Sequence, residues 1–130
     1  MRTETKYWVD YAVYDLETAK AMLNSGRYLY VTFMCQQAIE KILKAIIIES
    51  KSVAPPFSHN LRRLAEIAGI DQEMTEEQIN FLDDLSPFCV AARYPAYKNK
   101  MAGIATENVF AKYLVKTKEM FQWLKNLITI

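Results

Sequence analysis

The sequence predicts an all-α fold, an antiparallel bundle of about five helices. Apolar residues recur at spacings of three and four along several long segments, and turn-forming residues separate these segments. No alternation of apolar and polar residues extends beyond a few positions. With 130 residues, 52% hydrophobic, the chain suffices for one core, and we expect a single domain over residues 1–130. The net charge of +1 gives no bulk electrostatic reason for nucleic acid binding, so any such contact must be local.

The stretch Tyr28–Glu49 is predicted to be the central helix, because it contains no Gly or Pro and is apolar around most of its circumference. We expect other helices or a second subunit to wrap it, since leaving its Ile, Leu and Phe side chains in water would forfeit about 1.5–3 kcal/mol each. A narrow polar stripe interrupts the apolar surface and consists of Gln36, Gln37, Glu40, Lys41 and Lys44.

A first helix is predicted to begin between Thr3 and Thr5 and to end at Leu23, before the turn Asn24-Ser25-Gly26. The short turn makes the first two helices antiparallel neighbours. Asp15 lies within the arc of the apolar row, and we interpret it as a structural carboxylate that meets an Arg or a backbone donor, since an unpaired buried carboxylate is costly. A functional role for Asp15 is the alternative. The apolar row consists of Trp8, Ala12, Leu16, Ala19 and Leu23.

A third helix follows a loop that contains Pro55-Pro56, a pair that cannot continue a helix. Ser58 is predicted to cap this helix over His59–Ala68, and Gly69 closes it. His59 is the only histidine of the chain. We interpret it as a capping or packing residue, because the local sequence provides no partner for acid/base chemistry or for a metal.

A fourth helix is predicted to start with a capping box formed by Thr75 and Gln78. Pro87 should kink this helix or open one of its turns. The helix should end near Arg93, because Tyr94 precedes a proline and is disfavoured in helical geometry.

A last helix is predicted from Glu107 to about Ile128, capped by Thr106, and its apolar residues recur at three- and four-residue spacing. Cys35 and Cys89 are expected to be buried free thiols, since both lie in apolar rows without close cysteine partners. The charged N-terminus is unlike a signal peptide, and no apolar run approaches ~20 residues. We therefore expect a cytoplasmic protein that does not bind membranes.

The segment Arg93–Lys100 gathers cations and phenols after the fourth helix. Its cationic side chains can contact phosphates, and its phenol rings can stack on a base or ribose. The candidate nucleotide- or RNA-binding residues are Arg93, Tyr94, Tyr97, Lys98 and Lys100. Alternatively, Arg93 pairs with Asp15 or another carboxylate, and the tyrosines pack beneath the loop. No metal site is predicted, because the acidic residues are spaced like helix-start and surface charges and the single histidine supplies no ligand cluster.

These pieces together resemble the HEPN domain family, small helical domains described as nucleotide-binding modules. The likeness covers nearly the whole chain, and its most specific part is the ordered run Gln36-Gln37-Ala38 followed by Glu40-Lys41. The other matching pieces are the spacing of Trp8, Ala12, Asp15-Leu16 and Ala19, then Gly26-Arg27-Tyr28, Ser58-His59-Asn60-Leu61 and Ala92-Arg93-Tyr94-Pro95.

The resemblance implies an antiparallel helical bundle, usually a homodimer, often with a minimal nucleotidyltransferase as partner. Many relatives are ribonucleases or toxins whose active site combines an Arg with a His a few residues later. Arg93 matches that Arg, but the His would fall at Lys98, Asn99 or Lys100. A neutral imidazole exchanges protons near pH 7, whereas lysine is a poor base at its ordinary pKa. The resemblance therefore supports the fold and weakens the assignment of nuclease activity.

We therefore expect a nucleotide- or RNA-binding or partner-binding module without a cofactor. It would be a homodimer that works with a minimal nucleotidyltransferase in a toxin–antitoxin-like two-component system. One alternative is a metal-independent endoribonuclease that uses Arg93 with His59, Lys98 or Tyr97. The other is a dimeric adaptor with no ligand.

Overall fold

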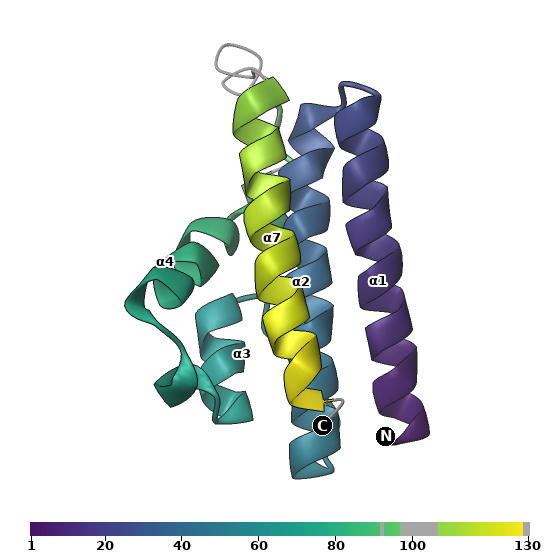
Figure 1. The fold of residues 1–130 in the computed structure, drawn as a ribbon, viewed down its shortest axis with the longest axis vertical. Helices are drawn as coiled ribbons and strands as arrows, with labels where there is room; N and C mark the ends of the chain where they lie inside the picture. The colour runs from purple at the N-terminus through teal and green to yellow at the C-terminus, as the bar shows by residue number, and fades with distance from the viewer. Residues whose placement is uncertain (92, 97–106, 129–130) are drawn as a thin grey trace.

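The computed structural model describes residues 1–91, 93–96 and 107–128. Three long helices lie side by side, and two shorter ones pack on one flank of this layer (Figure 1). α1 and α2 are antiparallel neighbours, as predicted, and α7 runs in the same direction as α2. The helices of eight residues or more in the described ranges are α1 (Thr3–Asn24), α2 (Tyr28–Lys51), α3 (Leu61–Ala68), α4 (Glu76–Leu85) and α7 (Glu107–Ile128). The predicted helical bundle is confirmed.

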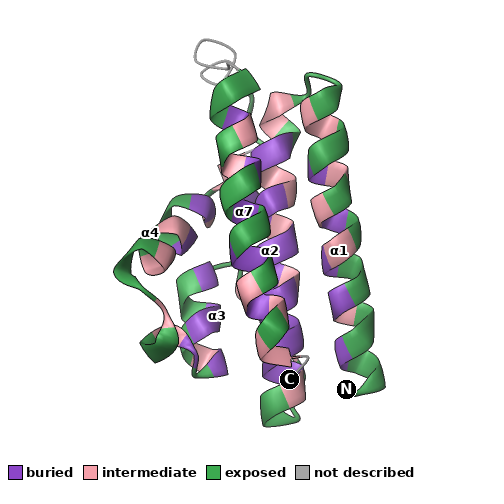
Figure 2. Ribbon diagram, in the orientation of Figure 1, coloured by how far each residue is buried: buried purple, intermediate pink, exposed green. Residues whose placement is uncertain are grey.

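α2 lies at the centre of the bundle, against α1, α3 and α7 (Figure 2). Most of its apolar side chains are fully buried within the single chain, which confirms the prediction that other helices wrap it. The polar stripe differs from an ordinary solvated one, because Gln36, Glu40 and Lys44 are buried as well. Buried polar groups are costly unless they are hydrogen-bonded, so these three side chains require partners inside the fold.

α1 begins at Thr3 and ends at Asn24, and Gly26 adopts the left-handed φ of 74° that the predicted turn requires. The face that it buries is rotated slightly from the predicted row. Val9 and Thr5 are buried, whereas Trp8 is half-buried at the edge of the core. This rotation places Trp8 beside the polar face of α2.

The start of α3 differs from the prediction, because Asn60 rather than Ser58 is its cap. The Asn60 side-chain oxygen accepts the backbone N–H of Arg63 at 3.0 Å, and Ser58 Oγ instead accepts the backbone N–H of Asn60 at 3.1 Å. The helix therefore begins at Leu61, and His59 lies in the non-helical segment before it. The predicted end at Gly69, with φ 76°, is confirmed.

The predicted capping box of α4 is confirmed: Thr75 and Gln78 exchange hydrogen bonds of 2.9 and 3.1 Å. Pro87 then separates α4 from the one-turn helix α5 (Phe88–Ala91). Between α3 and α4 lies the 3-10 turn η1 (Asp71–Glu73). α5 holds Cys89 in the interior, and the next turn ends with Arg93, whose N–H donates to the Val90 carbonyl at 3.0 Å.

α7 covers α2 over the length that the sequence predicts, and the proposed cap Thr106 lies outside the described residues. Phe110 stacks on Tyr28 of α2 with ring centroids 5.3 Å apart. Cys35 and Cys89 are buried free thiols, as predicted. In the described part of the chain, no helix has the combination of length and apolarity that a bilayer span requires.

Candidate functional site

The candidate site begins with a row of polar side chains on the otherwise apolar helix α2. Gln36, Glu40 and Lys44 occupy successive turns, and Glu40 and Lys44 are only 4% and 6% exposed. The Gln36 amide donates to Glu40 Oε1 at 3.0 Å, and the Lys44 ammonium donates to Glu40 Oε2 at 3.0 Å. Each carboxylate oxygen of Glu40 therefore has a donor from its own helix.

His59 completes the hydrogen bonding of this carboxylate from outside the helix. Its Nδ1 lies 2.9 Å from Glu40 Oε1, and the Gln36 amide also donates to the His59 carbonyl at 3.2 Å. The interpretation of His59 as a capping or packing residue misses this contact, because the partner is supplied by α2 and not by the local sequence. The His59 side chain is 55% exposed, so the ring joins a buried carboxylate to the surface.

The hydrogen bonds to Glu40 determine its protonation. Burial, the largest single influence, raises its pKa, but donors from Gln36, His59 and Lys44, together with the Lys44 charge, outweigh burial and lower the pKa below its ordinary value. Glu40 is therefore ionised at neutral pH. Since an ionised carboxylate only accepts hydrogen bonds, Nδ1 of His59 donates in this contact.

Cys89 and Arg93 border the same group. One ligand atom from each of Glu40, His59 and Cys89 lies within 4.8 Å of the other two. Burial and then the negative charge of Glu40 raise the pKa of Cys89, while the positive charges of Arg93 and Lys44 oppose that rise. The Arg93 guanidinium is thus close enough to act on Cys89. We call Gln36, Glu40, Lys44, His59 and Cys89 the α2 polar cluster, with exposed Arg93 at its edge.

The predicted binding residues are only partly within the described chain. Arg93 and Tyr94 are exposed on the surface after α5. Tyr97, Lys98 and Lys100 lie outside the described residues. Among the described candidates, Arg93 is linked to the α2 polar cluster through the effect of its charge on Cys89.

Asp15 is a buried partner of Lys41, and the alternative in which Arg93 pairs with Asp15 is wrong. The Lys41 ammonium contacts the Asp15 carboxylate and lies 3.7 Å from the centre of the Tyr11 ring. Burial raises the pKa of Asp15, and the contact with Lys41 limits that rise. The sequence analysis expects an Arg or a backbone group as the donor. A lysine serves because Lys41 of α2 faces α1 at the level of Asp15.

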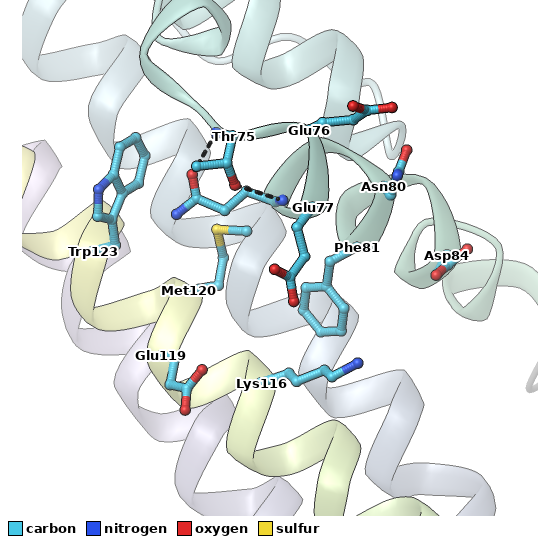
Figure 3. Close-up of a pocket in the computed structure, with 11 residues that line it drawn as sticks. Thr75, Glu76, Glu77, Asn80, Phe81, Asp84, Lys116, Glu119, Met120 and Trp123 are labelled. Atoms are coloured by element: carbon cyan, nitrogen blue, oxygen red, sulfur yellow. Dashed lines mark hydrogen bonds between the residues drawn. The ribbon is translucent and has the colours of Figure 1, made fainter.

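A groove of about 630 Å³ lies elsewhere, between α4 and α7 (Figure 3). Phe81, Met120 and Trp123 supply its apolar lining. Its charged residues are Glu76, Glu77, Asp84, Glu119 and Lys116. Four carboxylates against one ammonium oppose the binding of a phosphate, so this groove is a poorer candidate for nucleotide chemistry than the α2 polar cluster, despite its size.

The comparisons with known proteins agree with the motifs in the sequence. The HEPN domain family matches residues 5–127. The chain belongs to the HEPN domain family. Among solved structures, the crystal structure of TT1696 from Thermus thermophilus is similar, with a TM-score of 0.80 and 19% identity over 96% of this chain and 98% of that chain. At this identity the likeness shows the fold alone. No curated protein matches the chain.

The positions that carry the HEPN resemblance meet in space. Gln36 and Glu40 come from the central motif, and His59 comes from the motif that precedes α3. Sequence analysis misses this cluster because Glu40 and Lys44 resemble parts of a solvated stripe. A usable signal is present, since polar residues at positions 36, 40 and 44 interrupt an apolar helix at one-turn intervals.

Proposed function

We propose that this HEPN domain binds the phosphate groups of a nucleotide or an RNA at Arg93, beside the α2 polar cluster. The observation that carries the proposal is the local charge. Glu40 and Lys44 neutralise each other, and among the described residues no carboxylate lies within ion-pair distance of Arg93. An exposed guanidinium without a carboxylate partner suits a phosphate, to which it can donate two hydrogen bonds. Membership of the HEPN family supports a nucleotide- or RNA-related module.

The proposal includes a homodimer and a minimal nucleotidyltransferase partner in a toxin–antitoxin-like pair. HEPN domains commonly dimerise. Tyr7, Tyr11 and Tyr14 also form an exposed aromatic row along α1, and aromatic side chains are enriched at protein interfaces. The family resemblance alone supports the nucleotidyltransferase partner.

Binding of a labelled RNA oligonucleotide and of a nucleoside triphosphate tests the phosphate site. Arg93→Ala should weaken both by roughly tenfold or more, because it removes a charge-assisted hydrogen bond. Arg63→Ala is the matched control, since it removes another exposed guanidinium, on α3. Unchanged affinity in folded Arg93→Ala would remove the proposal. Affinity purification from the native cells tests for the nucleotidyltransferase.

A second candidate function is metal-independent RNA cleavage, and the Glu40–His59 hydrogen bond favours it. A carboxylate that holds Nδ1–H leaves Nε2 available to accept a proton, as a general base must. His59 would then replace the missing motif histidine, with Arg93 beside the phosphate. Cleavage that disappears in both Arg93→Ala and His59→Ala would support this function, and no cleavage at high protein concentration would end it. A dimer that carries neither ligand nor partner would instead indicate the adaptor.

A further inference from the structure

We propose that Glu40, His59 and Cys89 form a site for one thiophilic divalent cation of the Zn²⁺ type. The three side chains come from α2, from the segment before α3 and from α5, and their ligand atoms lie within 4.8 Å of one another. Sequence analysis predicts no metal site because the single histidine has no nearby ligand in sequence. The three ligands are far apart in the sequence, and the packing of α2, α5 and the segment before α3 brings them together.

The donor set is suited to zinc, which binds carboxylate oxygen, imidazole nitrogen and thiolate sulfur. In a tetrahedral site with bonds of ~2.0–2.3 Å, ligand atoms lie about 3.3–3.7 Å apart. His59 Nδ1 and Glu40 Oε1 are 2.9 Å apart, so the ion would take the place of the proton between them after small movements, and the neutral imidazole would carry its proton on Nε2 instead. Three protein ligands leave a fourth position for water or a ligand oxygen.

An ion can reach the cluster from the side of the exposed His59, and neighbouring hydrogen bonds hold the Glu40 carboxylate in place. His59 lies in a non-helical segment with its side chain 55% exposed, so its ring can move and opens a path to the interior. Cys89 is only 1% exposed and lies on the inner side of the cluster. Gln36 and Lys44 donate to Glu40 and orient its carboxylate, as outer hydrogen bonds do in metal sites.

The charges around the cluster select the type of cation. Lys44 already pairs with the Glu40 carboxylate, so a hard cation that depends on carboxylate oxygen must compete with this ammonium for its one anionic ligand. A thiophilic ion displaces the Cys89 thiol proton to solvent and gains a thiolate ligand, whose negative charge the Lys44–Glu40 pair does not already neutralise. We therefore expect Zn²⁺ or Co²⁺ to bind and Mg²⁺ not to compete.

Titration of the metal-free full chain with Co²⁺ tests the site, because a thiolate ligand produces a sulfur-to-cobalt charge-transfer absorption. We expect this absorption to saturate at one Co²⁺ per chain, to disappear when Zn²⁺ is added and to persist in excess Mg²⁺. Cys89→Ser should abolish it. Cys35→Ser is the matched control, since it removes the other buried thiol, and it should leave the spectrum unchanged.

His59→Ala provides an independent test in case Cys89→Ser impairs folding. His59 is mostly exposed, so its removal should preserve the helical circular dichroism while weakening Co²⁺ binding at least tenfold. Absence of a charge-transfer band in the native chain would overturn the proposal. A band that survives both Cys89→Ser and His59→Ala, or that disappears in Cys35→Ser, would also overturn it.

Discussion

His59 and Glu40 are joined by a 2.9 Å hydrogen bond that links the segment before α3 to the buried face of α2. The bond holds the His59 ring in one orientation through its Nδ1 atom, and it gives Glu40 a donor from outside its own helix. The carboxylate also accepts from Gln36 and Lys44 of the same helix, so two of its donors depend on α2 and the third on the packing of the segment before α3. The stability of the fold and the chemistry of the candidate site therefore depend on one ionised group.

Acid should weaken the fold through Glu40. The pKa of this carboxyl is lower in the folded chain than its ordinary value of 4.5, so the folded state binds the proton more weakly than the unfolded state does. The resulting stability is fully present above about pH 4.5 and is lost as the pH falls through the lowered pKa. Urea unfolding between pH 7 and pH 3 should show a shallower acid loss for Glu40→Gln than for the native chain. Equal slopes would contradict this role of Glu40.

At neutral pH the buried ion pair between Glu40 and Lys44 should be costly to break. Glu40→Ala leaves the buried ammonium of Lys44 without its carboxylate, and breaking a buried pair in this way costs about 3 kcal/mol or more. Asp83→Ala is a matched control, because it breaks an exposed pair with Arg62, and such pairs contribute ~1 kcal/mol or less. Urea unfolding at pH 7 measures both. Similar losses in the two variants would mean that Lys44 finds another acceptor or reaches water.

The cap of α3 can be assigned by two substitutions. Asn60→Ala should destabilise the chain by about 1 kcal/mol, because it removes the acceptor for the Arg63 N–H. Ser58→Ala removes only the hydrogen bond to the Asn60 N–H in an exposed turn, so its effect should be smaller. Thermal and urea unfolding compare the two variants. A larger loss for Ser58→Ala would restore the helix start that the sequence analysis predicts.

Features that depend on local sequence are predicted more accurately than the site. The capping box at Thr75, the turn at Gly26 and the break at Pro87 each depend on residues close together in the chain, and all three occur in the structure. The start of α3 is missed because Ser58 and Asn60 are both capping residue types, and their sequence does not decide between them.

The candidate site depends on tertiary contacts that no local pattern contains. The family motif identifies Arg93, but the contact between His59 and Glu40 exists only in the folded chain, where the segment before α3 lies against α2. The pairing of Asp15 with Lys41 likewise requires the relative rotation of α1 and α2. Residue types therefore indicate which groups need partners, and the helix packing decides which partners they obtain.

Thiol reactivity should follow burial in this protein. Burial raises the pKa of Cys35 to about 11, and Cys89 is also buried with a raised pKa. A thiol reacts as its thiolate, so neither residue should react with an aromatic disulfide reagent in the folded chain at pH 8, whereas both should react in urea. Rapid reaction of one thiol in the folded chain would show that its helix opens locally.

Ile39 of α2 belongs to the hydrophobic core and is fully buried between the neighbouring helices. Ile39→Ala should destabilise the chain by about 2–5 kcal/mol, because it removes buried apolar area and leaves a cavity in a close-packed core. Val115→Ala on the exposed side of α7 is the control and should change stability by roughly 0.5 kcal/mol or less. Urea unfolding at pH 7 compares the two variants. If both changes were small, α2 would not be the helix on which the packing of the bundle depends.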